Sequence, residues 1–193
     1  MKYKANENYS HGDKKKIGVL IVNLGTPDEP TTSAVRKYLA EFLSDPRIVE
    51  IPRVIWWLIL NLIVLNLRPQ KSKDLYKKVW TKEGSPLLVI SNNIVNKIKK
   101  STSISNRKDI MIDLAMRYGN PSVDKALNNF QNNNIDKLLI LPMFPQYSAA
   151  TTASIFDKVT KIIGTWRNMP DIRFLSTYHD NPSYISACAN RVS

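Results

Sequence analysis

Cysteine and histidine are nearly missing from this chain of 193 residues, which holds one Cys and two His. The thiol of Cys188 has no disulfide partner, and a lone thiol excludes a zinc site built from several thiolates. Such cysteine usage is typical of a reducing compartment, so we expect a cytoplasmic protein. Cys188 itself is expected to be a small core residue of the last helix.

Glycine-rich phosphate loops and internal repeats are also missing. The six glycines form neither a G-x-G-x-x-G nor a G-x-x-x-x-G-K-[ST] pattern, which disfavours nucleotide binding. No periodic proline and no self-similar segment is visible, which excludes collagen-like and solenoid classes. The length allows one domain or slightly more, with enough apolar residues for a core.

Acidic residues are few: 16 Asp and Glu stand against 28 Lys and Arg, which gives a formal charge of +12. The lysines are scattered, except in Lys14 to Lys16, and they form no recognisable nucleic-acid motif. We therefore expect no nucleic-acid partner. A strongly positive chain is still attracted to anionic surfaces, including acidic lipids and carboxylate-rich ligands.

What the chain does contain is an alternation of strand-like and helix-like segments after a polar, flexible arm at residues 1–16. Continuous apolar runs predict buried strands, and apolar residues at helical spacing predict the helices between them. The expected strands are 17–24, 109–116, 137–143 and 172–178, and the expected helices are 32–43, several within 53–100, one from 123, 149–163 and one from 182. This order implies right-handed crossovers and a Rossmann-like parallel sheet with helices on both faces, so the fold class is α/β.

Ligands of such folds bind outside the carboxyl ends of the strands. The turns that follow the predicted strands, and the start of the helix at 149, carry aromatic and hydroxyl side chains with one fixed cation. These residues are Arg117, Tyr118, Tyr147, Ser148, Thr151 and Thr152. Such a mixture suits a flat, largely apolar ligand with acidic or carbonyl groups at its edge.

The most apolar segment is 54–67, in which twelve of fourteen residues are apolar, with Arg53 and Arg68 at its ends. As a helix at about 1.5 Å per residue it would be about 21 Å long, which is too short to cross the roughly 30 Å hydrocarbon core of a bilayer. Two interpretations stay open. The segment is either a buried core helix or an exposed apolar lip, with Trp56 and Trp57 at the interface and the arginines near lipid headgroups.

Several motifs together resemble the ferrochelatase family in order and spacing. They are Asn23-Leu24-Gly25-Thr26-Pro27, the helix end Tyr38 to Arg47, Tyr76 with Gly84-Ser85-Pro86, the turn Met116 to Pro121, and the segment Pro145 to Thr152. The resemblance runs from about residue 17 to the last residue. Because ferrochelatases are about twice as long, the chain resembles their amino-terminal half. Residues 17–178 would form the first chelatase-like domain, and 179–193 would begin the connection to a second one.

This resemblance implies a lyase of haem biosynthesis that inserts ferrous iron into protoporphyrin IX in a cleft between two similar halves. Iron would be a substrate, and no cofactor is implied. The histidine and the acidic residue that act in the family would lie beyond Ser193, so the chain alone is expected to bind porphyrin without catalysis and to hold no metal site. Residues 53–68 would be the lip through which the protein contacts the inner face of the membrane.

Position by position, the resemblance implies three groups of porphyrin contacts. The macrocycle face would be lined by Leu24, Phe42 and Ile48. The porphyrin edge would lie near Arg68, Tyr76 and Ser85. The inner wall of the cleft would hold Arg117, Tyr118, Tyr147 and Ser148. Propionate groups would be held by Arg68 or Arg117 and by hydroxyls, since charge-assisted hydrogen bonds are stronger than neutral ones.

Other interpretations stay open beside this one. The chain could be a non-catalytic tetrapyrrole-binding module or an unrelated α/β regulatory domain, and coproporphyrin is an alternative substrate. We expect Asp45 and Arg47 to form a cap and ion-pair site. Of the two histidines, His11 lies in the polar arm, and His179 is expected to be a surface or hydrogen-bonded residue.

Overall fold

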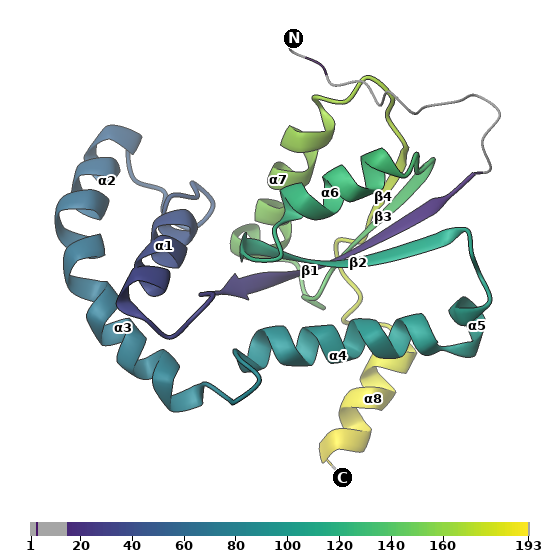
Figure 1. Ribbon diagram of the computed structural model, residues 1–193, viewed down its shortest axis with the longest axis horizontal. Coiled ribbons are helices and arrows are strands. Elements are labelled where there is room, and N and C mark those ends of the chain that lie inside the picture. Colours follow the sequence, from purple (N-terminus) through teal and green to yellow (C-terminus); the bar gives the residue numbers. More distant parts are fainter. Residues whose placement is uncertain (1–2, 4–14, 193) are drawn as a thin grey trace.

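A computed structural model describes residue 3 and residues 15–192 of the chain. At its centre lies a four-stranded parallel sheet in the order β2-β1-β3-β4 (Figure 1). The strands are β1 (Ile17–Thr26), β2 (Ile110–Gly119), β3 (Lys137–Pro142) and β4 (Asp171–Phe174). The helices of the first half are α1 (Thr32–Leu43), α2 (Arg53–Ile59), the π-helix η1 (Leu60–Val64), α3 (Leu65–Val79), α4 (Pro86–Lys100) and α5 (Thr102–Ser105). Those of the second half are α6 (Val123–Asn132), the π-helix η2 (Ala149–Ala153), α7 (Ser154–Ile163) and α8 (Pro182–Val192).

Helices cover both faces of the sheet, as the apolar runs in the strands predict. Leu20 and Val22 of β1 pack into a hydrophobic cluster with residues of α6 and α7. Ile21, on the opposite face, packs into a second cluster that includes Val95 of α4. Figure 1 shows α6 and α7 on one side of the strands and α4 on the other. The α/β class is therefore confirmed.

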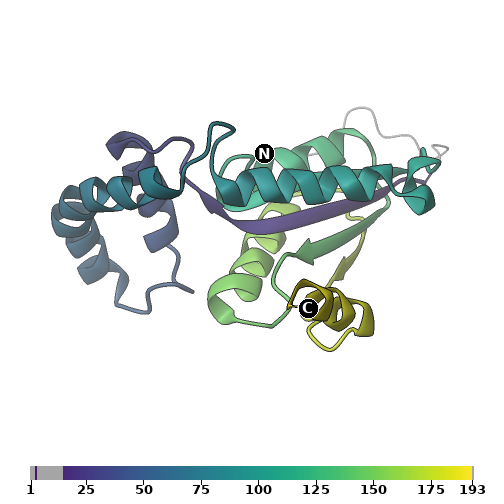
Figure 2. The ribbon, with the colours of Figure 1, turned by 90° about the horizontal axis from the view of Figure 1, so that it is seen from below.

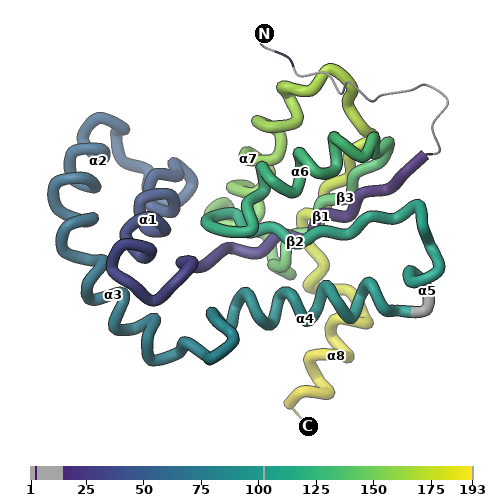
Figure 3. Tube along the Cα trace, in the orientation of Figure 1, coloured from purple at the N-terminus to yellow at the C-terminus, as the bar shows by residue number. Residues whose placement is uncertain are grey.

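Residues 32–79 form a separate helical unit beside the sheet (Figure 2). The unit consists of α1, α2, η1 and α3, and it has its own cluster of buried residues: Leu43, Leu60 and Leu65. Figure 3 shows the chain leaving the end of β1, building this unit, and returning along α4 to the start of β2. The helical unit thus stands next to the carboxyl end of β1.

The carboxyl ends of β1 and β2 lie unusually close together. Gly25, paired with Tyr118 across the two strands, has a φ of 118°. A Cβ at this position would lie only 1.8 Å from the carbonyl oxygen of Tyr118. Glycine is required here for both reasons, because an L side chain would be strained by the φ and would collide with the backbone of β2.

Several boundaries differ from the predicted ones. The strand predicted at 109–116 runs from Ile110 to Gly119, and the one predicted at 137–143 ends at Pro142. β1 continues through Gly25 and Thr26, because both pair with β2. The helix predicted at 149–163 begins with a π-helical segment, Ala149–Ala153, before α7. The strand predicted at 172–178 begins at Asp171 and ends at Phe174, which pairs with Ile140 of β3.

Two predictions concern the ends of the chain: the polar arm at residues 1–16 and the burial of Cys188. The predicted polar arm falls mainly on residues 1–2 and 4–14, which, with His11, lie outside the described residues. The amide of Lys16 donates to the Asp136 carboxylate at 2.9 Å, so the last residue of the predicted arm is held at the sheet. The prediction that Cys188 is a core residue is wrong: it is exposed on α8, which buries no residue.

Candidate functional site

The carboxyl edge of the sheet brings most of the predicted site residues to one end of the molecule. Leu24 ends the predicted run of β1, and Arg117 and Tyr118 lie beside it at the end of β2. Tyr147 and Ser148 follow β3, whose Pro142 pairs with Val22 of β1. The parallel register therefore places these residues at the edge where α/β folds bind their ligands.

An aromatic row crosses from the helical unit to the sheet. It consists of Trp80, Tyr76, Tyr38, Phe42 and Tyr118, in which neighbouring ring centroids are 5.1–6.4 Å apart. The Tyr38 and Phe42 rings are stacked at an interplanar angle of 4°, and the other pairs meet edge to face. Burial raises the pKa of the Tyr38 and Tyr118 phenols, so both stay protonated at neutral pH. The row joins α3, α1 and β2 through contacts between uncharged aromatic rings.

A polar network centred on Asp45 lies next to this row. The Oδ2 atom of Asp45 accepts hydrogen bonds from Arg117 Nη2 at 2.5 Å, from the Tyr118 hydroxyl at 2.7 Å and from Ser154 Oγ at 2.5 Å. Its Oδ1 atom accepts from the Arg47 amide at 2.8 Å. Burial opposes ionisation of Asp45, but the hydrogen bonds from Ser154, the Arg47 amide and Tyr118, together with the Arg117 charge, hold its pKa below 3.8.

Arg117 is engaged inside the protein. Besides its bond to Asp45, its Nε donates to the carbonyl oxygen and the hydroxyl of Ser154 at 2.9 and 2.7 Å. Its guanidinium carbon also lies 4.4 Å from the centroid of the Tyr118 ring. The side chains of Arg117 and Asp45 are only 12% and 4% exposed. The geometry therefore gives Arg117 an internal partner for its charge, and its contact with a propionate stays a prediction.

The remaining predicted residues differ in how far they are open to solvent. Arg68, Tyr147 and Ser148 are exposed, Tyr147 with 60% of its surface. Ser85 is buried and accepts a hydrogen bond from the Thr26 hydroxyl at 2.8 Å. Ile48 is partly buried and packs against the cluster of the helical unit.

Arg47, the residue two positions after Asp45, forms an exposed ion pair with α7. The hydrogen bond to Asp157 raises the pKa of Arg47. Arg47 Nε donates to the Asp157 carboxylate at 2.7 Å, which confirms the predicted ion-pair role of this region.

The segment 53–68 is exposed on one face, while Leu60 and Leu65 on the other face are buried in the cluster of the helical unit, so it is not a wholly buried core helix. Val54, Trp57 and Leu62 are 76%, 62% and 66% exposed. Trp56, predicted to share the interface, instead packs on the cluster of the helical unit, and its Nε1 donates to the Leu43 carbonyl oxygen at 2.6 Å. No helix within the described part of the chain is long and apolar enough to cross a membrane.

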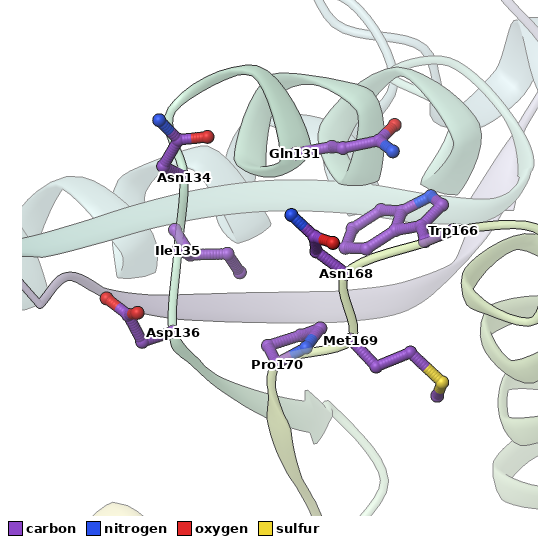
Figure 4. A pocket seen from close by; sticks show the side chains of 8 residues that line it. All are labelled: Gln131, Asn134, Ile135, Asp136, Trp166, Asn168, Met169 and Pro170. Carbon is purple, nitrogen blue, oxygen red and sulfur yellow. The ribbon is translucent and has the colours of Figure 1, made fainter. Parts of the chain in front are cut away.

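One cavity lies beside the predicted site residues and another lies at the opposite edge of the sheet. One of about 580 Å³ lies between the helical unit and the sheet, and Asp45, Arg117 and Asp157 are among its lining residues. The other, of about 250 Å³, lies at the amino ends of β3 and β4 and includes Asp136 and Trp166 (Figure 4). It lies at the sheet edge opposite the predicted site and contains none of the predicted residues. Among residues 15–192, no group of three or more His, Cys, Asp or Glu side chains is arranged to hold a metal ion.

The family profile described as Ferrochelatase matches residues 16–193. The chain belongs to the ferrochelatase family. A ferrochelatase of Marinobacter nauticus is 50% identical over 192 residues, which cover 100% of this chain and 52% of that protein. Ferrochelatase 2 of Shewanella oneidensis is 52% identical over 94% of the chain and 55% of its own length, and a ferrochelatase of Alcanivorax borkumensis is 51% identical over 100% and 56%. The chain thus spans about half the length of these curated ferrochelatases.

The sequence assigned no site role to Tyr38 or Ser154. Tyr38 was named only as the first residue of the motif Tyr38 to Arg47, although its spacing of four from Phe42 indicates that the two rings share a helix face. Ser154 carried no signal, because its partner Asp45 is 109 residues away in sequence. His179 is exposed and its Nδ1 lies 2.6 Å from the Thr177 hydroxyl, as expected for a surface, hydrogen-bonded histidine.

Proposed function

We propose that this chain forms one wall of the porphyrin site of an enzyme that inserts ferrous iron into protoporphyrin IX during haem biosynthesis. Its membership of the ferrochelatase family supports the reaction. The observation that carries the proposal is the aromatic row beside the Asp45 network at the carboxyl edge of the sheet. Aromatic side chains with polar groups next to them suit a macrocycle, and Phe42, Tyr76 and Trp80 of the row are partly exposed.

Metal insertion depends more on the shape of the binding site than on reactive side chains. Metal insertion requires two pyrrole protons to leave and the planar ring to bend so that its nitrogen lone pairs face the incoming ion. A rigid apolar wall favours the bent ring when contacts elsewhere on the substrate supply the strain energy. The macrocycle carries the reactive nitrogens, so the wall mainly positions and desolvates it.

We assign the propionate contacts to exposed groups. Arg68 and Tyr147 are open to solvent, so a carboxylate reaches them without disturbing the fold. The charge of Arg117 is already compensated by Asp45, and moving it to a ligand would leave the buried carboxylate without its cation. We therefore infer that Arg117 and Tyr118 shape the wall, while Arg68 and Tyr147 hold the edge of the substrate.

We further propose that the lip contacts a membrane peripherally. Its exposed residues, among them Trp57 and Leu62, form an apolar surface that a protein rarely presents to water. Arg53 and Arg68 stand at the two ends of the segment, where cations would meet acidic headgroups. A lip of this kind would bring the site close to an apolar porphyrin dissolved in the bilayer, which favours protoporphyrin over coproporphyrin.

Titration of the chain with protoporphyrin IX tests this proposal. We expect a shift of the Soret band on binding. Replacing Arg68 by Ala or Tyr147 by Phe should weaken the affinity by about 3- to 10-fold, because exposed charged contacts are partly screened. Lys97→Ala, which removes an exposed cation from α4, serves as the control and should leave the affinity unchanged. Absence of any Soret shift, or equal effects of all three substitutions, would contradict the proposed wall.

The same titration separates the alternatives. Tighter binding of coproporphyrin than of protoporphyrin would replace the proposed substrate. If the full-length gene product binds porphyrin tightly and inserts no iron, the chain belongs to a non-catalytic tetrapyrrole-binding protein.

A further inference from the structure

The helical unit and the sheet have separate hydrophobic cores. The buried cluster of the unit consists of Leu43, Leu60 and Leu65, and none of these belongs to either cluster of the sheet. The apolar contact between the two parts is confined to the aromatic row, in which Phe42 meets Tyr118 at 5.1 Å, and is smaller than the contact between a sheet and the helices that cover it.

The junction between the two parts is instead rich in hydrogen bonds. The backbone amide of Gly119 donates to Glu41 Oε2 at 2.9 Å, and the Asn120 amide group donates to both oxygens of Asp28 at 2.9 and 3.2 Å. Arg47 pairs with Asp157 across the same junction. These contacts are exposed, so water competes with each of them.

Asp45 makes buried contacts at this junction, as does the Tyr38 hydroxyl of α1, which donates to the Gly25 carbonyl oxygen of β1 at 3.3 Å. Asp45 is 6% exposed, and its Oδ2 atom receives donors from both β2 and α7. The Tyr118 and Ser154 hydroxyls each have one proton, and both oxygens lie within hydrogen-bonding distance of Asp45 Oδ2. The same two oxygens lie 2.9 Å from each other, so Asp45, Tyr118 and Ser154 form one closely packed polar cluster.

We propose that Asp45 is a positioning residue that fixes both the directions of Arg117 and Tyr118 and the angle between the helical unit and the sheet. It acts through these two residues and has no contact with substrate in this assignment. The consequence for the porphyrin wall rests on the proposed function, because Phe42 of the unit and Tyr118 of the sheet belong to one aromatic row. The fixed angle does not depend on that function.

The negative charge of Asp45 is what this positioning role requires. Asn at this position has the same shape but offers one neutral acceptor and an amide that donates, so it cannot satisfy three converging donors. Arg117 would then lie buried without its anion, and such a cation moves toward water where the structure allows it. The cavity of about 580 Å³ beside Asp45 and Arg117 gives it room to do so.

Distances between spin labels test this inference without porphyrin. Labels at Lys71→Cys on α3 and Asn132→Cys on α6, in a Cys188→Ser background, report the position of the helical unit relative to the sheet. We expect one narrow distance distribution for the otherwise unchanged chain. Asp45→Asn should widen it at least twofold, while the circular dichroism stays that of a folded protein.

Asp157→Asn is the matched control, since it removes a carboxylate from the same junction that does not touch Arg117. It should leave the distribution narrow. A residue that only adds stability would change the unfolding midpoint without widening the distribution of the folded chain. An unchanged distribution in folded Asp45→Asn, or equal widening by Asp157→Asn, would overturn the inference.

Two single-donor variants decide the matter if Asp45→Asn does not fold. Tyr118→Phe and Ser154→Ala each remove one hydrogen bond to Asp45, and each should widen the distribution, with a larger effect when they are combined. Narrow distributions in both would overturn the inference. A chain that shows these changes but no Soret shift with protoporphyrin would refute the proposed function and leave the role of Asp45 intact.

Discussion

Removing the hydroxyl of Tyr118 is expected to destabilise the chain by about 2 kcal/mol. The residue is fully buried, and its hydroxyl donates to ionised Asp45 at 2.7 Å. Hydrogen bonds to charged groups contribute about 1.5–3 kcal/mol, and Asp45 keeps two other donors on the same oxygen, which places Tyr118→Phe near the middle of this range. Urea unfolding followed by circular dichroism measures the change in the free energy of unfolding.

Tyr38→Phe provides the matched comparison for this change. The Tyr38 hydroxyl is also buried but donates to a neutral acceptor, the Gly25 carbonyl oxygen, over a longer distance of 3.3 Å. We expect a loss of about 0.5–1 kcal/mol there. Combining Tyr118→Phe with Asp45→Asn should give a coupling energy of about 1–2 kcal/mol. Equal losses for the two tyrosines, or full additivity of the second pair, would refute the assignment of Asp45 as the acceptor.

Three further predictions concern the lip, a glycine and pH. Trp57→Asp should reduce binding to vesicles of phosphatidylcholine and phosphatidylglycerol several-fold, whereas Asn92→Asp, which adds the same charge on α4, should not; equal binding would argue against the lip as the contact. Gly25→Ala should abolish accumulation of folded protein, because its Cβ would lie 1.8 Å from a carbonyl oxygen; Gly84→Ala, at a similar φ of 117° but with nothing within 4 Å, should still fold. The lowered pKa of Asp45 means that its stabilising effect is complete above 3.8 and is lost as pH falls below that value. The difference in unfolding free energy between the unchanged chain and Asp45→Asn should therefore be constant from about pH 5 to 7 and shrink below about pH 4, and a decrease already above pH 5 would contradict this.

The parts of the fold that were predictable from sequence are those set by local pattern. Helix α1 has the predicted bounds, 32–43, because apolar residues recur at helical spacing and Ser44-Asp45-Pro46 ends the pattern. Its beginning is fixed by Thr31, whose side chain accepts from the Ala34 amide at 3.2 Å. The core of β1 was evident from a continuous apolar run, which a strand covered on both faces requires.

The parts that were not predictable depend on partners distant in sequence. The length of β4 is that of its pairing with Lys137 to Ile140 of β3, and no residue of β4 itself carries that information. The exposure of Cys188 depends on what α8 packs against. The donors to Asp45 come from positions 117, 118 and 154, so only the folded topology brings them together. The direction of Trp56 likewise depends on the carbonyl group of Leu43.

The separate core of the helical unit has a consequence for sequence divergence. Because the helical unit has its own hydrophobic core, it can be exchanged between related proteins as a whole, provided that the residues that form its contacts with the sheet are kept. A chimera that takes residues 32–79 from another member of the family would need to preserve the carboxylate at position 45. It would also need the arginine, tyrosine and serine at positions 117, 118 and 154, which donate hydrogen bonds to that carboxylate. Within each hydrophobic core, substitutions can compensate for one another. A mismatched substitution at the junction would instead disturb the contacts between the helical unit and the sheet.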